Sequence, residues 1–400
     1  MIRAGVGFSN SHNPRVAAAE ATASALAQAG LNRALGALCF ATPAYAAAYP
    51  MILRVVGSDA HTREVAGCSS MGVIAGEHEV ESGHALCVMV IGADEHRDEL
   101  RAARFFVPSL RGRAQGVAAE VATAVRPALG KTNLLILLAD TYNFEAEATL
   151  AALTSELPKV AITGGGASED GSIGETFVFC GDVVSSNAVS GMLLSGDFDL
   201  TMMSSLACSP IGPAHRVTAA RDNILLELDG RGAFDVFAEA AGPLATDLRR
   251  ALRYVFAAIP LDPRATTIER GRFVVRNIVG ASEEHGVVAV SFVPRVGDTI
   301  GFVLRDAERS RRDLKASLEE VSGKLISPPA FGLYFDCISR GAGLYGIPGH
   351  DSAYLRQSLG QVPIGGFFTG FEIGPLGDQT ALLQYSGVLA LISNKPVAPS

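Results

Sequence analysis

The chain has 400 residues and a formal net charge of −8, from 33 basic and 41 acidic side chains. Hydrophobic residues make up 48% of it and charged residues only 18%, which predicts large sheets buried on both faces. The diffuse acidic balance argues against a nucleic-acid surface, because such a surface needs clustered Lys and Arg. The apolar run at residues 34–53 contains Gly36, Pro43 and Pro50. A strand followed by a helix therefore fits it better than a membrane span.

The cysteines and the N-terminus indicate the compartment. Six cysteines are scattered without Cys-x-x-Cys spacing: Cys39, Cys68, Cys87, Cys180, Cys208 and Cys337. In a long apolar chain, this pattern is typical of reduced thiols and not of a disulfide framework. The opening residues lack the apolar segment of a signal peptide. We therefore expect a cytoplasmic protein.

The first third of the chain reads as alternating strands and helices. A strand is expected at residues 1–9 and a helix at residues 11–30, with polar residues at its start and Gly30 at its end. An apolar strand at residues 36–44 precedes a helical stretch, a glycine-containing strand at residues 64–76 and a further strand at residues 84–94.

The same order returns twice. After a helix at residues 113–130 come a strand, a helix, a glycine-rich strand exit and a strand, at residues 133–140, 144–157, 159–171 and 175–196. After a helix at residues 307–325 the corresponding segments are residues 330–339, 351–360, 362–375 and 380–392. We interpret this as a degenerate internal repeat with an irregular period, which favours duplication over a solenoid.

The expected fold is α/β, with two related domains, large mixed sheets and helices on the outer faces. The boundary is placed before a long helical segment at residues 233–259, which a β-rich block at residues 271–306 follows. The predicted domains are residues 1–230 and 231–393, with a disordered tail at residues 394–400.

Polar residues next to buried strands near the C-terminus predict a ligand site. The apolar strand ending at Cys337 is followed by Arg340, and Glu372 lies between apolar residues. A buried carboxylate needs a partner, and Arg340 is the natural one if the two strands are neighbours. Arg340 would also favour the thiolate of Cys337, for which His350 is the nearby histidine. Catalysis by Cys337 is the weaker interpretation.

Glycines at equivalent places of the three repeats predict that the strand exits converge. Gly67, Gly164 and Gly365 mark these exits, and glycine permits close backbone approach there. The predicted ligand-binding residues are Cys337, Arg340, Glu372, Gly365, Gly366, Cys68, Ser69, Gly164, Gly165 and Ser168. No metal site is predicted, because His78 and His84 lack a third ligand at the usual spacing.

Several motifs resemble the FIST family. "YFDCISRG", "GFFTGFEIGP" and "LLQYSGVLALI" are similar to its C-terminal domain, and "VAGCSSMG", "GGGASEDGSIGETFVF" and "SNAVSGMLLSGDFDL" to its N-terminal domain. The likeness covers roughly residues 36–392. One departure is Phe371, because the family often has a small or polar residue before this Glu. Its bulk would narrow or close a pocket.

The resemblance implies an intracellular sensory protein that binds a small ligand, with amino acids or small carboxylates among the candidates. Its signal would pass in trans to a partner protein, such as a histidine kinase or a cyclic-di-GMP enzyme. A second branch of the family implies a nitric oxide sensor with non-covalently bound haem, which needs an axial His, Cys, Met or Tyr. A cysteine-dependent hydrolase or transferase that uses Cys337 is the enzyme alternative.

Overall fold

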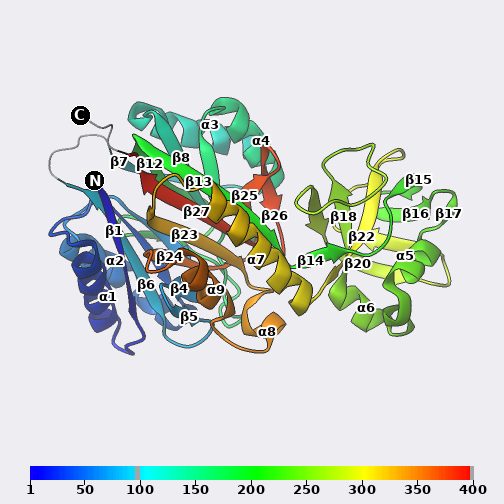
Figure 1. Cartoon of the computed structure of the whole chain (residues 1–400), viewed down its shortest axis with the longest axis horizontal. Helices are drawn as coiled ribbons and strands as arrows, with labels where there is room; N and C mark the ends of the chain where they lie inside the picture. Colours follow the sequence, from blue (N-terminus) through cyan, green and yellow to red (C-terminus); the bar gives the residue numbers. More distant parts are fainter. Residues whose placement is uncertain (95–99, 397–400) are drawn as a thin grey trace.

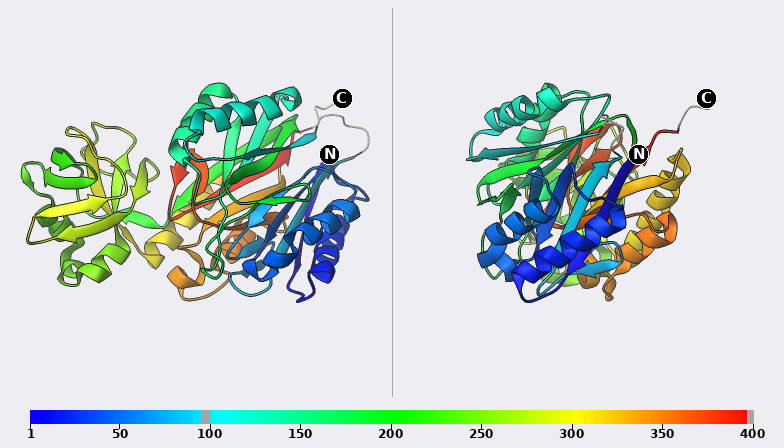
Figure 2. Two further views of the ribbon diagram at one scale, coloured as in Figure 1. Left: turned by 180° about the vertical axis from the view of Figure 1, so that it is seen from behind. Right: turned by 90° about the vertical axis from the view of Figure 1, so that its left-hand side faces the viewer.

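The computed structural model describes residues 1–94 and 100–396. Figure 1 shows a large core and a smaller lobe beside it. The core contains three six-stranded sheets, and the lobe contains a nine-stranded sheet. Helices cover the outer faces of the core sheets (Figure 2). The predicted α/β class with large mixed sheets and outer helices is confirmed.

The core consists of three units with the same order of elements. In the first unit these are β1 (Ile2–Ser9), α1 (Pro14–Ala29), β2 (Gly36–Ala41), α2 (Tyr49–Asp59), β3 (Val65–Ser69), β4 (Val73–Ala75), β5 (His78–Val80) and β6 (Leu86–Ala93). In the second they are β7 (Arg101–Pro108), α3 (Ala114–Val125), β8 (Thr132–Ala139), α4 (Ala146–Glu156), β9 (Ala161–Gly166), β10 (Val178–Cys180), β11 (Val183–Ser185) and β12 (Ala188–Gly196).

The third unit is interrupted by the lobe. It begins with β13 (Phe198–Leu206) and resumes about one hundred residues later with α7 (Ala307–Lys324). It continues with β23 (Pro329–Cys337), α8 (Gly341–Tyr345), α9 (His350–Leu359), β24 (Ile364–Thr369), β25 (Glu372–Leu376), β26 (Gln379–Leu383) and β27 (Ser386–Asn394). The predicted internal repeat is therefore present, and its third copy is split.

Each unit gives a hairpin to the sheet of another unit. The parallel pairs β2–β3, β8–β9 and β23–β24 lie at the centre of the three sheets. Hairpin β4–β5 pairs with β24, hairpin β10–β11 with β3, and hairpin β25–β26 with β9. This cyclic exchange interlocks the units.

The three sheets enclose one hydrophobic core. Its members come from the inner faces of all three sheets and include Phe40, Met89, Ile136, Met192 and Phe335. Three further clusters fill the outer layers, under α1 and α2, under α3 and α4, and under α7 and α9. The core therefore forms from all three units together.

The lobe consists of residues 208–305. Its elements are β14 (Cys208–Pro210), β15 (His215–Arg221), β16 (Ile224–Leu228), β17 (Arg231–Gly232), α5 (Ala233–Ala241), α6 (Leu248–Tyr254), β18 (Val255–Pro260), β19 (Phe273–Arg276), β20 (Ile278–Ser282), β21 (Val287–Val290) and β22 (Thr299–Arg305). The long helical segment predicted at residues 233–259 is helical only as far as Tyr254 and is divided into α5 and α6. Gly242 at φ 54° and the following proline end α5, and the apolar end of the segment forms β18 between β19 and β22.

Two sequence predictions stay open. Residue 230 lies in the turn between β16 and β17, which pair with each other inside the lobe sheet. The boundary between two domains at residue 230 therefore stays a prediction. Of the tail predicted at residues 394–400, the last four lie outside the described residues. Within the described ranges, no helix has the length and apolar character needed to cross a membrane.

Glycines allow the parallel strands of each unit to approach closely. Gly67 lies opposite Cys39, Gly164 opposite Leu137, and Gly366 opposite Tyr334. A Cβ atom at each would lie 1.8, 2.0 and 1.7 Å from the carbonyl oxygen of the facing residue. The equivalent glycines are therefore required by the same contact in each unit, and in the third unit the equivalent residue is Gly366 and not Gly365.

Substitution of Gly366 by Ala should lower the free energy of unfolding by about 1–3 kcal/mol or more, because the added methyl group forces the two strands apart. Gly323→Ala is the matched control, since a Cβ at this position in α7 has nothing within 4 Å. The control should be neutral or stabilising by up to about 1 kcal/mol. Urea denaturation measures both, and an undiminished stability of Gly366→Ala would contradict the contact.

Candidate functional site

The three strand exits meet inside the core. The Ser69 hydroxyl donates to the Ser168 carbonyl oxygen at 3.2 Å, and the Met71 backbone N–H donates to the Ser168 hydroxyl at 2.9 Å. The Ser70 hydroxyl donates to the carbonyl oxygen of Phe368 at 2.9 Å. The predicted convergence is therefore present. It is a closed polar junction, because these serines are buried.

Most of the predicted ligand-binding residues surround this junction. Cys68 is fully buried in the shared core, and Gly165 pairs with Glu372 across β9 and β25. Gly365 packs against Met89. Phe371 is buried and stacks on Phe144 with ring centroids 6.0 Å apart. These residues line none of the cavities described below, so their ligand binding stays a prediction.

Arg340 is the centre of a buried ionic cluster. It is 0% exposed, and its Nη2 donates to Asp351 Oδ2 at 2.6 Å. Its Nε lies 2.7 Å from Asp336 Oδ1, without hydrogen-bond geometry. The Tyr334 hydroxyl also donates to Asp351 Oδ2, at 2.7 Å. A buried cation between two buried aspartates fixes the end of β23 against the start of α9.

The two aspartates of this cluster differ in pKa. Although burial opposes ionisation, Arg340 and hydrogen bonds from His350 and Tyr334 hold the pKa of Asp351 below its usual value. Burial and the charge of Asp351 raise the pKa of Asp336 well above its usual value. The cluster is therefore best described as Arg340 with an ionised Asp351 and a neutral Asp336 beside it.

Glu372 has a separate set of partners. Its carboxylate accepts hydrogen bonds from the Thr369 hydroxyl at 2.6 Å, and from the Ser386 hydroxyl and backbone N–H at 2.6 and 3.1 Å. The predicted Arg340–Glu372 pair is therefore wrong. The reason is the hairpin exchange: β25, which carries Glu372, pairs with β9 of the second unit and not with β23 or β24.

Cys337 lacks the features of a nucleophile. It is 4% exposed, and burial followed by the charge of Glu372 raises the pKa of its thiol well above the usual value. The expectation that Arg340 favours a thiolate is therefore wrong. His350 binds Asp351 through Nδ1 at 2.9 Å and Arg311 through Nε2 at 3.2 Å, so both of its ring nitrogens are occupied.

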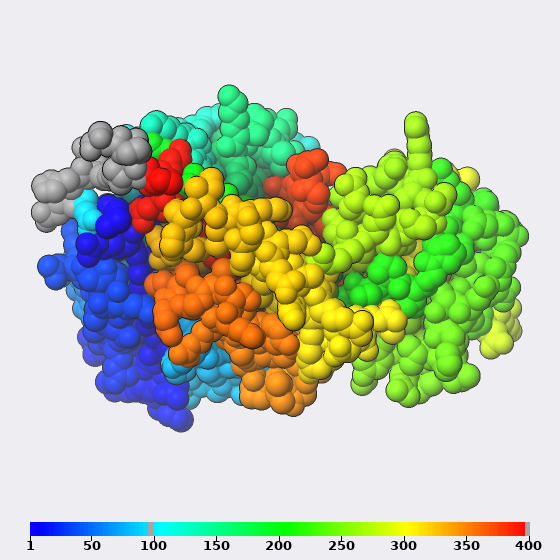
Figure 3. All heavy atoms as spheres, viewed as in Figure 1, coloured from blue at the N-terminus to red at the C-terminus, as the bar shows by residue number. Residues whose placement is uncertain are grey.

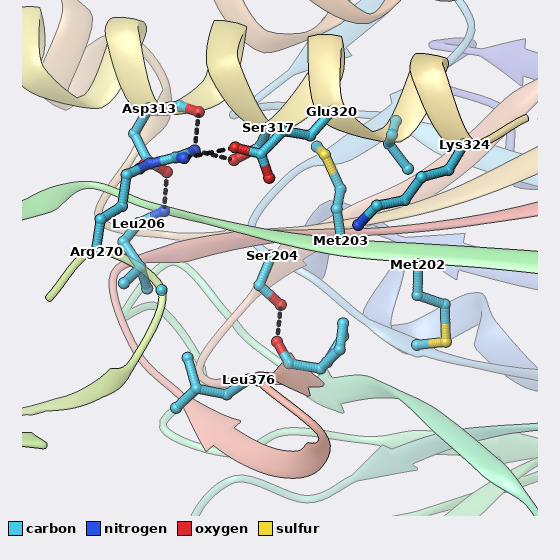
Figure 4. A pocket seen from close by; sticks show the side chains of 14 residues that line it. Met202, Met203, Ser204, Leu206, Arg270, Asp313, Ser317, Glu320, Lys324 and Leu376 are labelled. Carbon is cyan, nitrogen blue, oxygen red and sulfur yellow. Dashed lines mark hydrogen bonds and ion pairs between the residues drawn. The ribbon is translucent and has the colours of Figure 1, made fainter. Parts of the chain in front are cut away.

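A cavity of about 290 Å³ lies between the core and the lobe (Figure 4). Its walls are β13, α7, the tip of hairpin β25–β26 and the lobe loop that carries Arg270. From this loop, Arg270 donates to Asp313 Oδ1 at 2.5 Å, to Glu320 Oε1 at 2.8 Å and to the Ser317 hydroxyl at 2.8 Å. Asp313 also accepts from the backbone N–H of Leu206 at 2.7 Å. Arg270 therefore links the lobe to α7.

Charged and apolar side chains share this cavity. Lys324 extends from the end of α7 toward β13 in Figure 4, and within the described ranges no ion pair involves it. Met202, Met203 and Leu376 supply apolar surface. The ion pair of Arg270 and Asp313 also borders an adjoining cavity of about 320 Å³. The sequence did not indicate this site, because its charges belong to an ordinary charged helix and to a loop far away in the chain.

The alternative of non-covalently bound haem stays a prediction. Met202 and Met203 lie in the charged cavity between core and lobe. His78 lines a separate cavity of about 320 Å³, together with Glu77 and Arg356. A cavity of about 660 Å³ beside α4 has no axial ligand among its lining residues. Haem needs an apolar cavity with an axial ligand, and Cys208 lines the adjoining cavity of about 320 Å³ together with Leu206 and Phe273.

Arg340→Met should lower the free energy of unfolding by about 3–5 kcal/mol, because Asp351 would remain buried without its cation. Arg312→Met is the control, since Arg312 pairs with Glu308 on the exposed face of α7 with side chains 73% and 60% exposed. The control should change stability by no more than about 0.5 kcal/mol. Urea denaturation at pH 7 gives both values, and equal small effects would contradict the cluster.

Glu372 should make stability depend on pH. Burial raises the pKa of Glu372 from 4.5 to about 7, so the folded state retains a proton that the unfolded state releases. The stabilisation is complete below about pH 4.5 and is lost as the pH rises through about 7. Unfolding of wild type and Glu372→Gln from pH 4.5 to 8 isolates this contribution. A difference between them that stays constant with pH would contradict it.

Comparisons with known proteins identify the family. Residues 37–231 match the FIST N domain and residues 233–375 match the FIST C domain. The uncharacterized protein Rv0628c of Mycobacterium tuberculosis is 30% identical over 392 residues, covering 98% of this chain and 99% of that protein. The uncharacterized protein Mb0898c of Mycobacterium bovis is 28% identical over 391 residues, with 98% of each chain covered.

Among solved structures, cyanuric acid hydrolase from A. caulinodans is 11% identical, with a TM-score of 0.38 over 99% of this chain and 100% of that chain. A likeness at this level carries no inference about activity. The matched FIST segments together span most of the chain. The chain therefore belongs to the FIST family.

Proposed function

We propose that the protein is a cytoplasmic sensor that binds a small amino acid between the core and the lobe and signals to a partner protein in trans. The observation that carries this proposal is Arg270, which lines the cavity and links the lobe to α7. Membership of the FIST family supports a sensory role, and the six free cysteines suit a reducing compartment.

The connection between lobe and core has the form of a hinge. The chain enters the lobe after Leu206 and leaves it after Arg305, where β14 and β22 pair side by side. The backbone N–H of Ala207 donates to the carbonyl oxygen of Tyr385 at 2.7 Å. A body joined by two adjacent strands can rotate through changes in a few backbone dihedrals.

Tyr385 joins this hinge to the buried Glu372. Its hydroxyl donates to Oδ1 of Asn277 in the lobe at 2.6 Å, and the centroid of its ring lies 4.2 Å from the ring centroid of Phe256. The next residue, Ser386, is held by Glu372 through two hydrogen bonds. The lobe therefore contacts the turn at Tyr385, and the hydrogen bonds of Glu372 to Ser386 hold this turn to the interior of the core.

The cavity walls match a zwitterion with an apolar side chain. Arg270 and Lys324 offer positive charge to a carboxylate, and Asp313 and Glu320 offer negative charge to an ammonium group. The methionines and Leu376 offer contacts to an aliphatic side chain. These charges also have structural roles, because Arg270 pairs with Asp313 and Glu320 and Lys324 lies at a helix C-terminus, where a cation is favourable. The opposed pairs of charges around one cavity favour a ligand.

The energetics permit a ligand to replace the ion pair of Arg270 and Glu320. The side chains of Arg270 and Glu320 are 46% and 60% exposed, and exposed ion pairs contribute only about 0–1 kcal/mol. A ligand that contacts both α7 and the lobe would bind one arrangement of the two bodies better than others. That differential affinity is what a sensor requires.

L-leucine is the test ligand, with leucinamide and 4-methylpentanoate as controls that lack the carboxylate and the ammonium group, respectively. Calorimetry should detect binding of leucine, with at least about tenfold weaker binding of either control. Lys324→Met should weaken leucine binding, whereas Lys315→Met on α7, which lines none of the described cavities, should not. If none of the twenty amino acids binds, or if leucinamide binds as well as leucine, the proposal is wrong.

A further inference from the structure

A cavity of about 660 Å³ lies on the other flank of hairpin β25–β26. The hairpin tip touches the lobe (Figure 3), where a Cβ at Gly377 would lie 3.3 Å from Leu261. The cavity of about 290 Å³, proposed above to bind an amino acid, is lined by the hairpin residues before this tip. The larger cavity is lined by the hairpin residues after it. Its remaining walls are α4, the segment that leads into β9, and β19 of the lobe. The two cavities are therefore distinct.

The walls of this cavity are partly aliphatic and partly polar, the polar part including Asp378, Gln379 and Thr380 of hairpin β25–β26. Leu150 of α4, Val160, Leu261, Val274 and Leu382 line it. These side chains are buried or half-buried and belong to the hydrophobic clusters of the core or pack against them. A volume of several hundred Å³ with aliphatic and polar walls is typical of a site for a small organic molecule.

One buried cation lines this cavity. Arg276, on β19, is 8% exposed as a residue. Its Nε and Nη2 both donate to the same oxygen, Oε1 of Glu147, and its Nη1 donates to the backbone carbonyl of Val275 at 2.8 Å. The donor fork formed by Nε and Nη2 suits a carboxylate that accepts with both oxygens. Glu147 uses only one.

Glu147 is the exchangeable partner of this pair. Its side chain is 65% exposed, whereas that of Arg276 is 9% exposed. It lies in the first turn of α4, where a carboxylate remains favourable even without Arg276. Glu147 can therefore turn to solvent at little cost, while Arg276 must keep a partner because it is buried.

We propose that this cavity is a second binding site, for an aliphatic monocarboxylate of medium chain length. The carboxylate would replace Glu147 on Arg276, and the hydrocarbon chain would lie against Leu150, Val160 and Leu382. Lys159, which is exposed at the rim, adds positive charge near the entrance. This site does not depend on the amino-acid site, because Arg270 and Lys324 do not line it.

Decanoate is the probe, titrated calorimetrically into the full chain below its micellar concentration. Hexanoate and octanoate should bind progressively more weakly than decanoate, because each methylene removed reduces the buried apolar area. Decanol should bind at least about tenfold more weakly than decanoate, since it cannot pair with Arg276.

Two variants separate a ligand site from a purely structural ion pair. Arg276→Gln should lose decanoate binding, and Glu147→Gln should tighten it, because the competing carboxylate is gone. Arg126→Gln is the control, since Arg126 forms an exposed pair with Glu156 at the other end of α4. It should leave binding unchanged. If Arg276→Gln fails to fold, the effect of Glu147→Gln on decanoate binding still distinguishes a ligand site from a structural ion pair.

The proposal is overturned if decanoate does not bind, if decanol binds equally well, or if Glu147→Gln weakens binding. Lys324→Met should leave decanoate binding unchanged. Failure of leucine binding and failure of decanoate binding are therefore separate results, and each overturns a different proposal.

Discussion

The exchange of hairpins among the three core units is the constraint on which the rest of the structure depends. Because β4–β5, β10–β11 and β25–β26 each extend the sheet of another unit, no unit can complete its sheet alone. The close contacts at Gly67, Gly164 and Gly366 bring the parallel strands together, and the exits of β3, β9 and β24 then meet at one buried junction. The shared hydrophobic core follows from this closure.

The same exchange determines where charges lie. Hairpin β25–β26 carries Glu372 away from Arg340 and into the second sheet, where Thr369 and Ser386 satisfy the carboxylate. Arg340 instead finds Asp336 and Asp351. The tip of the hairpin also supports the lobe, with a cavity on each flank. Arg270 and Arg276, both from the lobe, reach the core on opposite sides of it.

The repeated order of elements could be predicted from the sequence, but the exchange of hairpins between units could not. The order of elements and the glycines of the strand exits recur in each unit, so the α/β class and the repeat were predictable from periodicity. The position of β25 was not, because adjacency in the chain suggested that it stays with β23 and β24. The lobe splits the third unit between β13 and α7, which hid β13 from the repeat. Arg270 and Lys324 carry no signal in the sequence, since they line one cavity only when the lobe meets α7.

The central claim is that a ligand bound between lobe and core changes their arrangement. Spin labels at Ala124→Cys on α3 and Glu284→Cys in the lobe would report the distance between the two bodies, in a background with Cys180→Ser, because the other five cysteines are buried. Pulsed dipolar spectroscopy should show a shifted or narrowed distance distribution when L-leucine is added, and no change with leucinamide. An unchanged distribution, with leucine binding verified on the same sample, would contradict the account.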